Sequence, residues 1–540
     1  MHHNIKSIVI VGGGSSGWMT TAAICRRLPD IKLTLVESPE IPTIGVGEST
    51  IGHINQFMQL LEIKDEDWMA ACNATYKTSI KFIDFRENPQ EKPHKFHYPF
   101  GRYDFTDKPR LLMDWFLIKT KYPDINSENF AEFYHDSVLM TDAGKMTRNE
   151  NSELREFDFA TDTAYHMDAS LFGTYLRDNL CLPNGMTHIV DTVVDATQDT
   201  NGSISGIVTR ASGTLTADLY IDCTGFKSLL LEQKLGVPFV SFNDTLLNDS
   251  AVATVIPYID KNKELENYTS CTAIEAGWVW NIPLWNRIGT GYVYSSKFAT
   301  KEQAEQQFRK HLKSNRMLFP DAARADAAEL RHIKIKHGVH THAWEKNVVG
   351  VGLANGFIEP LESTGLMLTH EAIVKIIAML SMRNGTVTQF DVDLFNHAFY
   401  EQISGFKHFI SQHYAMSMRN DTPYWKAATS DITYSRPMTD FTPSMYNSYN
   451  DIANAQHRSR IYSTELGGIM YIAAGMGYNP MDPALKDFLD RKFKEIPGYE
   501  TAVYQKWQEH QQQIQKIVAA LPTHKEFLEK TIYNTNIKDL

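Results

Sequence analysis

Three glycines near the N-terminus limit the fold of this 540-residue chain more than any other feature. They form a G-x-G-x-x-G motif made of Gly12, Gly14 and Gly17. The motif follows an apolar run at 8–11 and precedes a stretch of helical composition at 18–28, and a second apolar run follows at 32–37. This order predicts a strand, a tight turn, a helix and a second, parallel strand.

The motif predicts a dinucleotide site, because each glycine has its own purpose in such a turn. Gly12 permits the tight turn, Gly14 lets the backbone approach a pyrophosphate, and Gly17 lets the helix pack closely on the sheet. The pyrophosphate is expected at the positive helix N-terminus, next to Ser15. Glu37 ends the second run and is placed to accept a hydrogen bond from a ribose hydroxyl, so a 2′-phosphate, and hence NADP, is disfavoured.

Two later glycine turns favour FAD over NAD. The predicted strand 214–223 leads into a D-C-T-G turn, and the predicted strand 347–353 ends in G-L-A-N-G, which includes Gly352 and Leu353. An extended FAD needs such closing contacts at its isoalloxazine end. The other predicted strands are 203–210, 251–257, 278–282 and 289–294, and the predicted helices are 301–313, 369–382 and 501–521.

Composition excludes several classes of protein. A net charge of -11 argues against a nucleic-acid partner, which would need a basic face. The five cysteines are scattered, odd in number and never in a C-x-x-C pair, which predicts reduced thiols and no metal site. The N-terminus lacks a signal-peptide pattern, and no apolar stretch reaches the roughly 18 residues that span a bilayer. We therefore expect a cytoplasmic protein without a membrane partner.

Residues 278–283 read W-V-W-N-I-P, a second unusual feature. On a strand, Trp278 and Trp280 point to the same side because side chains alternate between faces. Pro283 has no N–H for a ladder and ends the strand. The segment is either an ordinary core strand or, beside a nucleotide site, an aromatic wall.

At this point the chain resembles a known family, the flavin-dependent tryptophan halogenases. The residues that carry the resemblance are 12–18 (G-G-G-S-S-G-W), 45–50 (G-V-G-E-S-T), 76–82 (Y-K-T-S-I-K-F), 278–283 (W-V-W-N-I-P), 357–365 (F-I-E-P-L-E-S-T-G) and 421–425 (D-T-P-Y-W). The resemblance covers nearly the whole chain, and W-x-W-x-I-P is far more specific than the glycine motif.

The resemblance implies an α/β fold with two modules. A glutathione-reductase-like FAD-binding module, built on the Rossmann-type βαβ unit, is expected to comprise 1–100, 160–300 and 330–384. A mostly helical substrate module is expected to comprise 101–159 and 385–540.

The resemblance also implies a two-component reaction that uses FAD as FADH2, a halide ion and O2. A separate NAD(P)H-dependent flavin reductase supplies the FADH2. Hypohalous acid forms at the flavin and passes to a lysine, which delivers the halogen to an electron-rich aromatic small molecule. An FAD-dependent aromatic hydroxylase of related fold and a flavin-binding protein without catalysis are the alternatives. Chloride, bromide or iodide as the halide, and a second copy of the chain as a partner, stay open.

Particular residues take family roles through this resemblance. Lys77 matches the essential lysine, whereas the nearby Lys81 does not. Glu362 matches the acid that positions hypohalous acid or takes the proton from the halogenated ring. Gly47 and Glu48 belong to the predicted cofactor site.

The turn before the predicted helix 369–382 is the expected halide site. Thr364 and Gly365 offer backbone N–H groups to an anion at a helix N-terminus. Helix capping by Ser363 or Thr364 is the other interpretation, since both are natural N-cap residues, and the two interpretations can hold together.

The substrate pocket departs from the family pattern. Tyr98 and Phe100 can form one aromatic wall, or they can be ordinary core residues. The opposite wall has small polar residues, Ser463 and Thr464, where members that act on free tryptophan have an aromatic pair. Ser363 and Ser463 are included in the predicted pocket lining with Trp278 and Trp280. We therefore expect an indole, phenol or other heteroaromatic substrate instead of free tryptophan.

Overall fold

The computed structural model describes residues 2–40, 47–88, 92–101, 114–431 apart from 116, 120, 315, 316 and 318, and then 466–477, 487, 490, 491 and 494–533. The chain divides into two compact units, each assembled from three segments. Unit 1 comprises 1–75, 164–243 and 335–404, and unit 2 comprises 76–163, 244–334 and 405–540.

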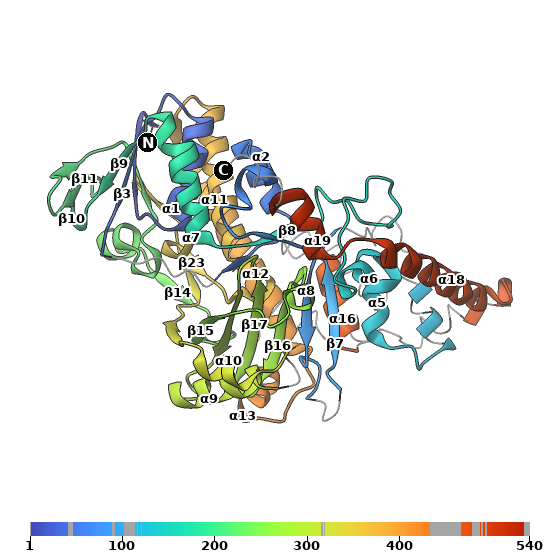
Figure 1. Ribbon diagram of the computed structural model, residues 1–540. Helices are drawn as coiled ribbons and strands as arrows, with labels where there is room; N and C mark the ends of the chain where they lie inside the picture. The colour runs from blue at the N-terminus through green and yellow to red at the C-terminus, as the bar shows by residue number, and fades with distance from the viewer. Residues whose placement is uncertain are drawn as a thin grey trace. The chain divides into compact units, whose positions relative to one another are not determined.

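A six-stranded sheet forms the centre of unit 1 (Figure 1). Its order is β21 (Trp344–Glu345), β22 (Val348–Gly350), β13 (Leu219–Asp222), β2 (Ser7–Val11), β3 (Lys32–Glu37) and β9 (Thr187–Val190). All neighbours pair in parallel except β21, which is antiparallel to β22. Ile8, Ile10 and Leu35 are buried, as expected for parallel strands covered on both faces. The predicted strands 8–11 and 32–37 are thus confirmed.

The predicted connecting helix is α1 (Ser15–Arg27). It packs against α7 (Ala169–Leu176) and α11 (Gly365–Met382), and the three helices lie together in Figure 1. Gly173 of α7 lies beside Trp18 of α1, since a Cβ at Gly173 would be in ordinary contact with the indole at 3.4 Å. The chain thus forms the expected strand–helix–strand unit.

In the part of the chain that the structure describes, α11 is the one helix long and apolar enough to cross a membrane. However, 56% of it is buried inside the protein, and it carries His370, Glu371 and Lys375. These polar residues interrupt the apolar run in the sequence. A core helix passes the same test of length and composition.

Two strand predictions need correction. The predicted strand 214–223 is divided into β12 (Thr214–Leu215), which pairs with β11 (Ile204–Thr209), and β13. Between them, Asp218 accepts hydrogen bonds of 2.9 Å from two backbone N–H groups at the start of β2. The predicted strand 347–353 ends at Gly350, because Gly352–Ala354 turn as a 3-10 helix.

Smaller elements complete unit 1. Its further strands are β1 (His2–Asn4) with β24 (Thr386–Thr388), β4 (Glu48–Ser49) with β8 (Ala164–Met167), β10 (Val193–Gln198) with β11, and β14 (Phe239–Ser241) with β20 (Gly338–His340) and β23 (Gly356–Phe357). Its short helices include α2 (Ile54–Leu61) and α3 (Asp65–Trp68).

A seven-stranded sheet forms the core of unit 2. Its order is β19 (Arg331–Lys334), β15 (Ser250–Ile256), β18 (Ile288–Tyr294), β17 (Gly277–Pro283), β16 (Tyr268–Ile274), β6 (Ser79–Ile83) and β7 (Lys95–Pro99). Neighbours are antiparallel except β16 and β6. The unit boundaries therefore differ from the predicted modules. Residues 76–100 and 244–300 lie in unit 2 because their strands extend this sheet, and 385–404 lie in unit 1.

Some of the helices of unit 2 pack around an aromatic core. The helices of unit 2 include α5 (Phe130–Tyr134), α6 (Ser137–Asp142), α8 (Lys261–Glu264), α9 (Lys301–Leu312), α10 (Ala322–Ala327), α13 (Pro423–Lys426), α16 (Leu466–Gly475), α18 (Tyr499–Ala520) and α19 (His524–Leu528). The core includes Trp115, Phe130, Tyr134 and Tyr471. The long α12 (Gln389–Ala415) precedes α13 in the chain, and the predicted helices 301–313 and 501–521 are confirmed as α9 and α18.

Candidate functional site

The glycine motif forms a tight turn whose outer side is open. Gly12 has φ +112°, and a Cβ there would lie 2.4 Å from the carbonyl oxygen of Cys223. A Cβ at Gly17 would lie 1.9 Å from the carbonyl oxygen of Gly12, so helix and turn are in direct contact. A Cβ at Gly14 would meet no described atom within 4 Å, and no side chain caps the first turn of α1. Here the backbone can be approached by a bulky anion.

Turns from three neighbouring parallel strands meet beside this helix. The turn after β2 touches Cys223, which follows β13. The turn after β22 also touches α1, because a Cβ at Gly352 would lie 2.1 Å from the Ser16 hydroxyl. Leu353 is 39% exposed next to it. Three sites far apart in sequence thus converge at the carboxyl edge of one sheet, where ligands of such sheets bind.

Asp222 holds the turn after β13 from inside. Its carboxylate accepts hydrogen bonds from the backbone N–H of Thr224 at 3.0 Å and of Leu230 at 2.7 Å. Burial raises the pKa of Asp222, and these hydrogen bonds oppose the rise. Asp222 therefore shapes the turn and is not available to a ligand.

Glu37 lies at the end of β3 as predicted, and a histidine that the sequence did not reveal holds it. Nε2 of His188 donates to Glu37 Oε1 at 2.8 Å. The imidazole also packs edge-on against Trp18, with ring centroids 5.1 Å apart. His188 comes from β9, and only the pairing of β9 with β3 brings it to Glu37. This long-range pairing leaves no local signal in the sequence.

The segment after Gly47 approaches the turn before α11. Gly47 has φ +116°, and the Ser49 hydroxyl of β4 accepts a 3.1 Å hydrogen bond from the Ser363 hydroxyl. Glu48 reaches solvent, yet enough protein surrounds its carboxyl group for desolvation to raise the pKa to about 7. Residues 45 and 46 lie outside the described part of the chain.

The start of α11 lacks the expected side-chain cap. Thr364 is the N-cap residue, but its hydroxyl makes no capping hydrogen bond. This buried hydroxyl has no hydrogen-bond partner among the described residues, and a Cβ at Gly365 would meet no described atom within 4 Å. Glu362 is buried in the preceding turn. Of the two interpretations of this turn, capping by Thr364 is not observed.

Lys77 ends β5 (Thr75–Lys77) and is completely buried. Its Nζ lies 4.9 Å from the centroid of the Phe100 ring. Lysine is almost never fully buried in proteins unless it is paired or functional. Most lysines are exposed, but Lys77 is buried and is not a surface lysine.

Trp278 and Trp280 form a continuous indole surface on β17. Their ring centroids lie 6.3 Å apart at an interplanar angle of 61°. Trp280 stands opposite Gly291 in the register, and a Cβ at Gly291 would lie 2.2 Å from the Trp280 ring. The Trp280 indole therefore occupies the space that a side chain at position 291 would need.

Tyr98 has an aromatic partner that the sequence did not predict. Its ring stacks on Tyr471 of α16, with centroids 5.9 Å apart and an interplanar angle of 25°. Tyr471 donates its phenolic proton to Nε2 of His135, whose pKa burial lowers to about 4. Ser463 and Thr464, where the loss of an aromatic wall was expected, lie outside the described residues.

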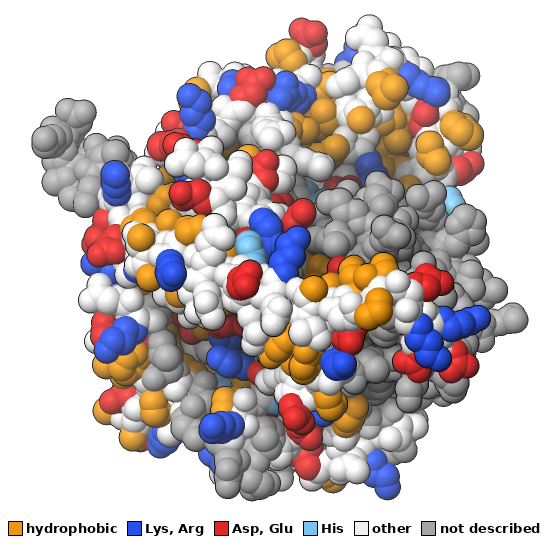
Figure 2. Space-filling view, turned by 90° about the vertical axis from the view of Figure 1, so that its right-hand side faces the viewer, with side chains coloured by type: hydrophobic (Ala, Val, Ile, Leu, Met, Phe, Trp, Pro, Cys, Tyr) orange, Lys and Arg blue, Asp and Glu red, His pale blue; other side chains and the backbone are white. Residues whose placement is uncertain are grey.

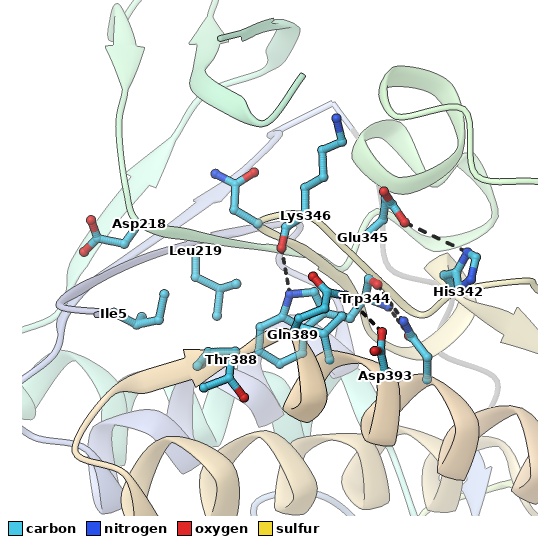
Figure 3. A pocket seen from close by; sticks show the side chains of 14 residues that line it. Ile5, Asp218, Leu219, His342, Trp344, Glu345, Lys346, Thr388, Gln389 and Asp393 are labelled. Atoms are coloured by element: carbon cyan, nitrogen blue, oxygen red, sulfur yellow. Dashed lines mark hydrogen bonds and ion pairs between the residues drawn. The ribbon is translucent and has the colours of Figure 1, made fainter. Parts of the chain in front are cut away.

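A small cavity of about 180 Å³ lies at the other edge of the unit 1 sheet (Figure 3). It lies beside Trp344, whose indole Nε1 donates to the carbonyl oxygen of Lys346 at 3.1 Å. The Asn396 side chain exchanges hydrogen bonds of 2.7 and 2.8 Å with the Trp344 backbone. These polar groups already have partners, so this cavity is not a candidate site.

Comparison with known proteins agrees with this fold. The family model described as tryptophan halogenase matches residues 7–487. The tryptophan 6-halogenase SttH of Streptomyces toxytricini is 37% identical over 78% of this chain and 80% of its own. The 7-chloro-L-tryptophan 6-halogenase KtzR of Kutzneria sp. (strain 744) is 36% identical over 80% and 83%.

Solved structures extend the likeness to the whole chain. The structure described as VirX1 in its apo form has a TM-score of 0.88 at 43% identity and covers 98% of this chain and 99% of its own. The flavin-dependent tryptophan C-6 halogenase Tar14, from taromycin biosynthesis, has a TM-score of 0.80 at 34% identity and covers 97% and 99%. This chain belongs to the tryptophan halogenase family of flavin-dependent halogenases.

Proposed function

We propose that the protein is an FADH2- and O2-dependent halogenase that passes hypohalous acid, through Lys77, to an electron-rich aromatic small molecule. The observation that carries the proposal is the complete burial of Lys77 at the position that matches the essential lysine of the family. Unit 1 would hold the flavin and unit 2 would hold the substrate. A separate NAD(P)H-dependent reductase would supply the reduced flavin.

The residues of unit 1 fit an FAD molecule. Gly12, Gly14 and Ser15 would hold the pyrophosphate, because the open flank at Gly14 admits a bulky anion. Glu37, held by His188, would accept a hydrogen bond from the ribose. Gly352, Leu353, Gly47 and Glu48 would line the remainder. The bound FADH2 would supply two of the four electrons that reduce O2, and the halide would supply the other two as it is oxidised to hypohalous acid.

The turn before α11 would bind the halide. The buried Thr364 hydroxyl has a proton to donate and no partner among the described residues. A Cβ at Gly365 would meet no described atom within 4 Å, and the first N–H groups of a helix have no intrahelical acceptor. A hydroxyl and free backbone N–H groups are suitable donors for a small anion.

Lys77 would present the oxidised halogen to the substrate. A charged Lys77 would donate a hydrogen bond to hypohalous acid and polarise it, whereas a neutral Lys77 would form a haloamine. Both routes deliver an electrophilic halogen to the ring. Glu362 would position the hypohalous acid or take the proton that the ring loses.

Trp278 and Trp280 would keep the substrate away from the flavin, so that the ring is halogenated instead of hydroxylated. The two indoles pack edge to face, and Trp280 also lies against Gly291 of the neighbouring strand. The second candidate function, aromatic hydroxylation, has no use for a buried Lys77.

The proposed substrate is an indole, phenol or other heteroaromatic ring. Relatives are described as acting on tryptophan or 7-chloro-L-tryptophan. In this chain Tyr98 is already stacked on Tyr471, so a substrate ring cannot occupy that face of Tyr98 unless Tyr471 moves. Phe100, Ser363 and Ser463 complete the proposed lining. Free tryptophan is therefore not the substrate we propose.

The test uses the full chain, a flavin reductase, FAD, NADH and a panel of indoles and phenols, with chloride, bromide and iodide in separate reactions. A halogenated product, identified by mass, supports the proposal. Oxygenated products alone would favour the hydroxylase. If the double variant Trp278→Phe, Trp280→Phe halogenates normally and makes no oxygenated product, the separating role of the indoles is wrong.

A further inference from the structure

Unit 2 contains a cavity of about 480 Å³ that none of the proposed steps uses. It lies between α18, α5 and the loop at 155–156. Cavities of about 300–1,000 Å³ with aromatic walls and a few polar groups are typical binding sites for small molecules. Figure 2 shows the face of the molecule that lies on the α18 side of Figure 1. On this face, basic, acidic and histidine side chains lie close to apolar ones.

Aromatic side chains form the apolar part of the lining. They come from Phe133, Tyr134, Tyr499 and Trp507. Trp507 packs on Phe133 with ring centroids 5.6 Å apart and edge-on against Trp115 at 6.4 Å. Both partners belong to or pack on the aromatic core that includes Tyr471, so the lining is held in place from behind. These surfaces suit a flat aromatic ligand.

The indole of Trp507 also has an unmet hydrogen-bonding group. Its Nε1 is buried and has no hydrogen-bond partner among the described residues. An indole N–H can only donate. A buried donor without a partner is costly, and an acceptor atom on a ligand would remove this cost.

The charges around the cavity are not all compensated. Arg155 and His510 both bind the fully buried carboxylate of Asp136, at 3.2 and 2.8 Å. Lys506 precedes Trp507 on α18, lines the same cavity and makes no ion pair with any described residue. Lys506 and Trp507 are consecutive residues of α18, and both line the cavity.

Two acidic residues limit the negative charge of a ligand that can bind in the cavity. Asp114 and Glu156 also line it, and Asp114 accepts a 3.0 Å hydrogen bond from the Tyr499 hydroxyl. A dianion such as a phosphate would be repelled by both carboxylates. A single carboxylate that faces Lys506 would not meet this barrier to the same degree.

The geometry points to a binding site for an aromatic carboxylate in this cavity. The ring packs on Phe133 and Trp507, and the carboxylate accepts hydrogen bonds from the Trp507 indole and the Lys506 ammonium. The site is distinct from Lys77 and does not depend on flavin chemistry.

The test is a fluorine NMR titration of the full chain with 5-fluoroindole-3-acetic acid and, separately, with 5-fluoroindole. The acid is expected to give a bound resonance at this site and to bind at least about tenfold more tightly than the neutral indole, as for one charge-assisted contact. Trp507→Phe keeps the ring and removes the N–H, and Lys506→Gln removes the charge. Each should weaken binding of the acid about tenfold.

Lys516→Gln is the matched control, because it removes a lysine from an exposed position of the same helix and should leave the titration unchanged. If Trp507→Phe does not fold, Lys506→Gln carries the test alone. Equal affinity in the wild type and in Lys506→Gln, or equal binding of the acid and the neutral indole, would overturn the site. Binding of the acid solely at a resonance that neither variant shifts would overturn it too.

Discussion

Lys77 and Lys81 lie four residues apart in unit 2, and both are buried, but their surroundings differ. Lys81 Nζ forms a 2.5 Å ion pair with Asp142 and lies 4.8 Å from the Tyr268 ring. The ion pair is part of a hydrogen-bond network. His97 Nε2 donates to the same carboxylate oxygen of Asp142 at 3.1 Å. His97 Nδ1 accepts a hydrogen bond of 2.8 Å from the Ser79 hydroxyl. Lys77 Nζ lies 4.9 Å from the centroid of the Phe100 ring.

The difference shows that burial alone does not mark a reactive lysine. Burial by itself would raise the pKa of Asp142, but His97 and Lys81 together hold it well below its ordinary range. The charge of Lys81 is thus tied to a fixed counter-charge, as in a structural ion pair. We expect Lys81 to stabilise unit 2 and Lys77 to serve the chemistry.

The largest expected effect is on catalysis by the lysine variants. Lys77→Met keeps the length of the side chain and removes its amine, so halogenated product should fall by at least about a thousandfold, in the upper range for loss of a positioned polar group. Lys81→Met, the matched control, should keep most of its activity per folded molecule. Product is measured by mass spectrometry at equal amounts of folded protein. A similar loss of activity in Lys77→Met and Lys81→Met would contradict the different roles of the two lysines.

The second effect concerns stability and has the opposite pattern. Lys81→Met leaves Asp142 with one partner fewer and should lower the free energy of unfolding by about 3 kcal/mol, as expected when one partner of a largely buried ion pair is removed. Asp142→Asn combined with Lys81→Met should recover part of this loss. Urea unfolding followed by circular dichroism measures it. A Lys81→Met protein as stable as the wild type would show that the ion pair is not structural.

The third effect is a pH dependence of the free energy of unfolding. It comes from His524, which is bonded to Tyr76, the residue before Lys77. The backbone N–H of Tyr76 donates to Nε2 of His524 at 3.3 Å, and His524 Nδ1 donates to the carbonyl oxygen of Leu265 at 3.2 Å. Burial lowers the pKa of His524 to about 4. Between the usual histidine pKa of about 6.5 and this value, the unfolded chain binds a proton that the folded chain does not.

Stability should therefore fall as the pH drops from about 6.5 to about 4, with His524 contributing about 1.4 kcal/mol per pH unit. His524→Gln keeps an acceptor for the Tyr76 N–H and should flatten the profile by that amount. The measurement is the free energy of unfolding at several pH values. Parallel profiles for the two proteins would contradict the assignment.

The smallest effect concerns the ring that faces Lys77. Phe100→Leu keeps an apolar contact and removes the π face, which should cost about 0.5–1 kcal/mol of interaction with a charged amine. Activity should drop by about two- to fivefold if Lys77 works as an ammonium ion. No change would favour a neutral Lys77, and thus the haloamine route.

The sequence predicted local elements better than contacts between distant segments. Local patterns fully encode the turn at Gly12 and the helix after it, and the strand that ends at Glu37 follows from the same pattern. His188 and Tyr471 were missed, because their contacts arise from strand pairing and helix packing over long sequence separations. The same holds for the partners of Lys81, since Asp142 is 61 residues away.

The predicted boundaries of strands and modules were less accurate than the predicted elements. Asp218 divides a predicted single strand by bonding to the start of β2. Residues 76–100 and 244–300 were expected in the FAD-binding module and lie in unit 2. Neither the partner of a strand nor its sheet can be read from a local apolar run.

The central claim is that Lys77 uses an oxidised halogen that is made elsewhere in the protein. The direct test measures two products of one reaction with bromide: the brominated arene, and hypobromous acid released to a trapping β-diketone. The wild type should give mainly brominated arene, and Lys77→Met should give trapped hypobromous acid at the same rate of FADH2 consumption with almost no brominated arene. If Lys77→Met instead brominates the arene at the wild-type rate, or releases no hypobromous acid while still consuming FADH2, the claim is contradicted.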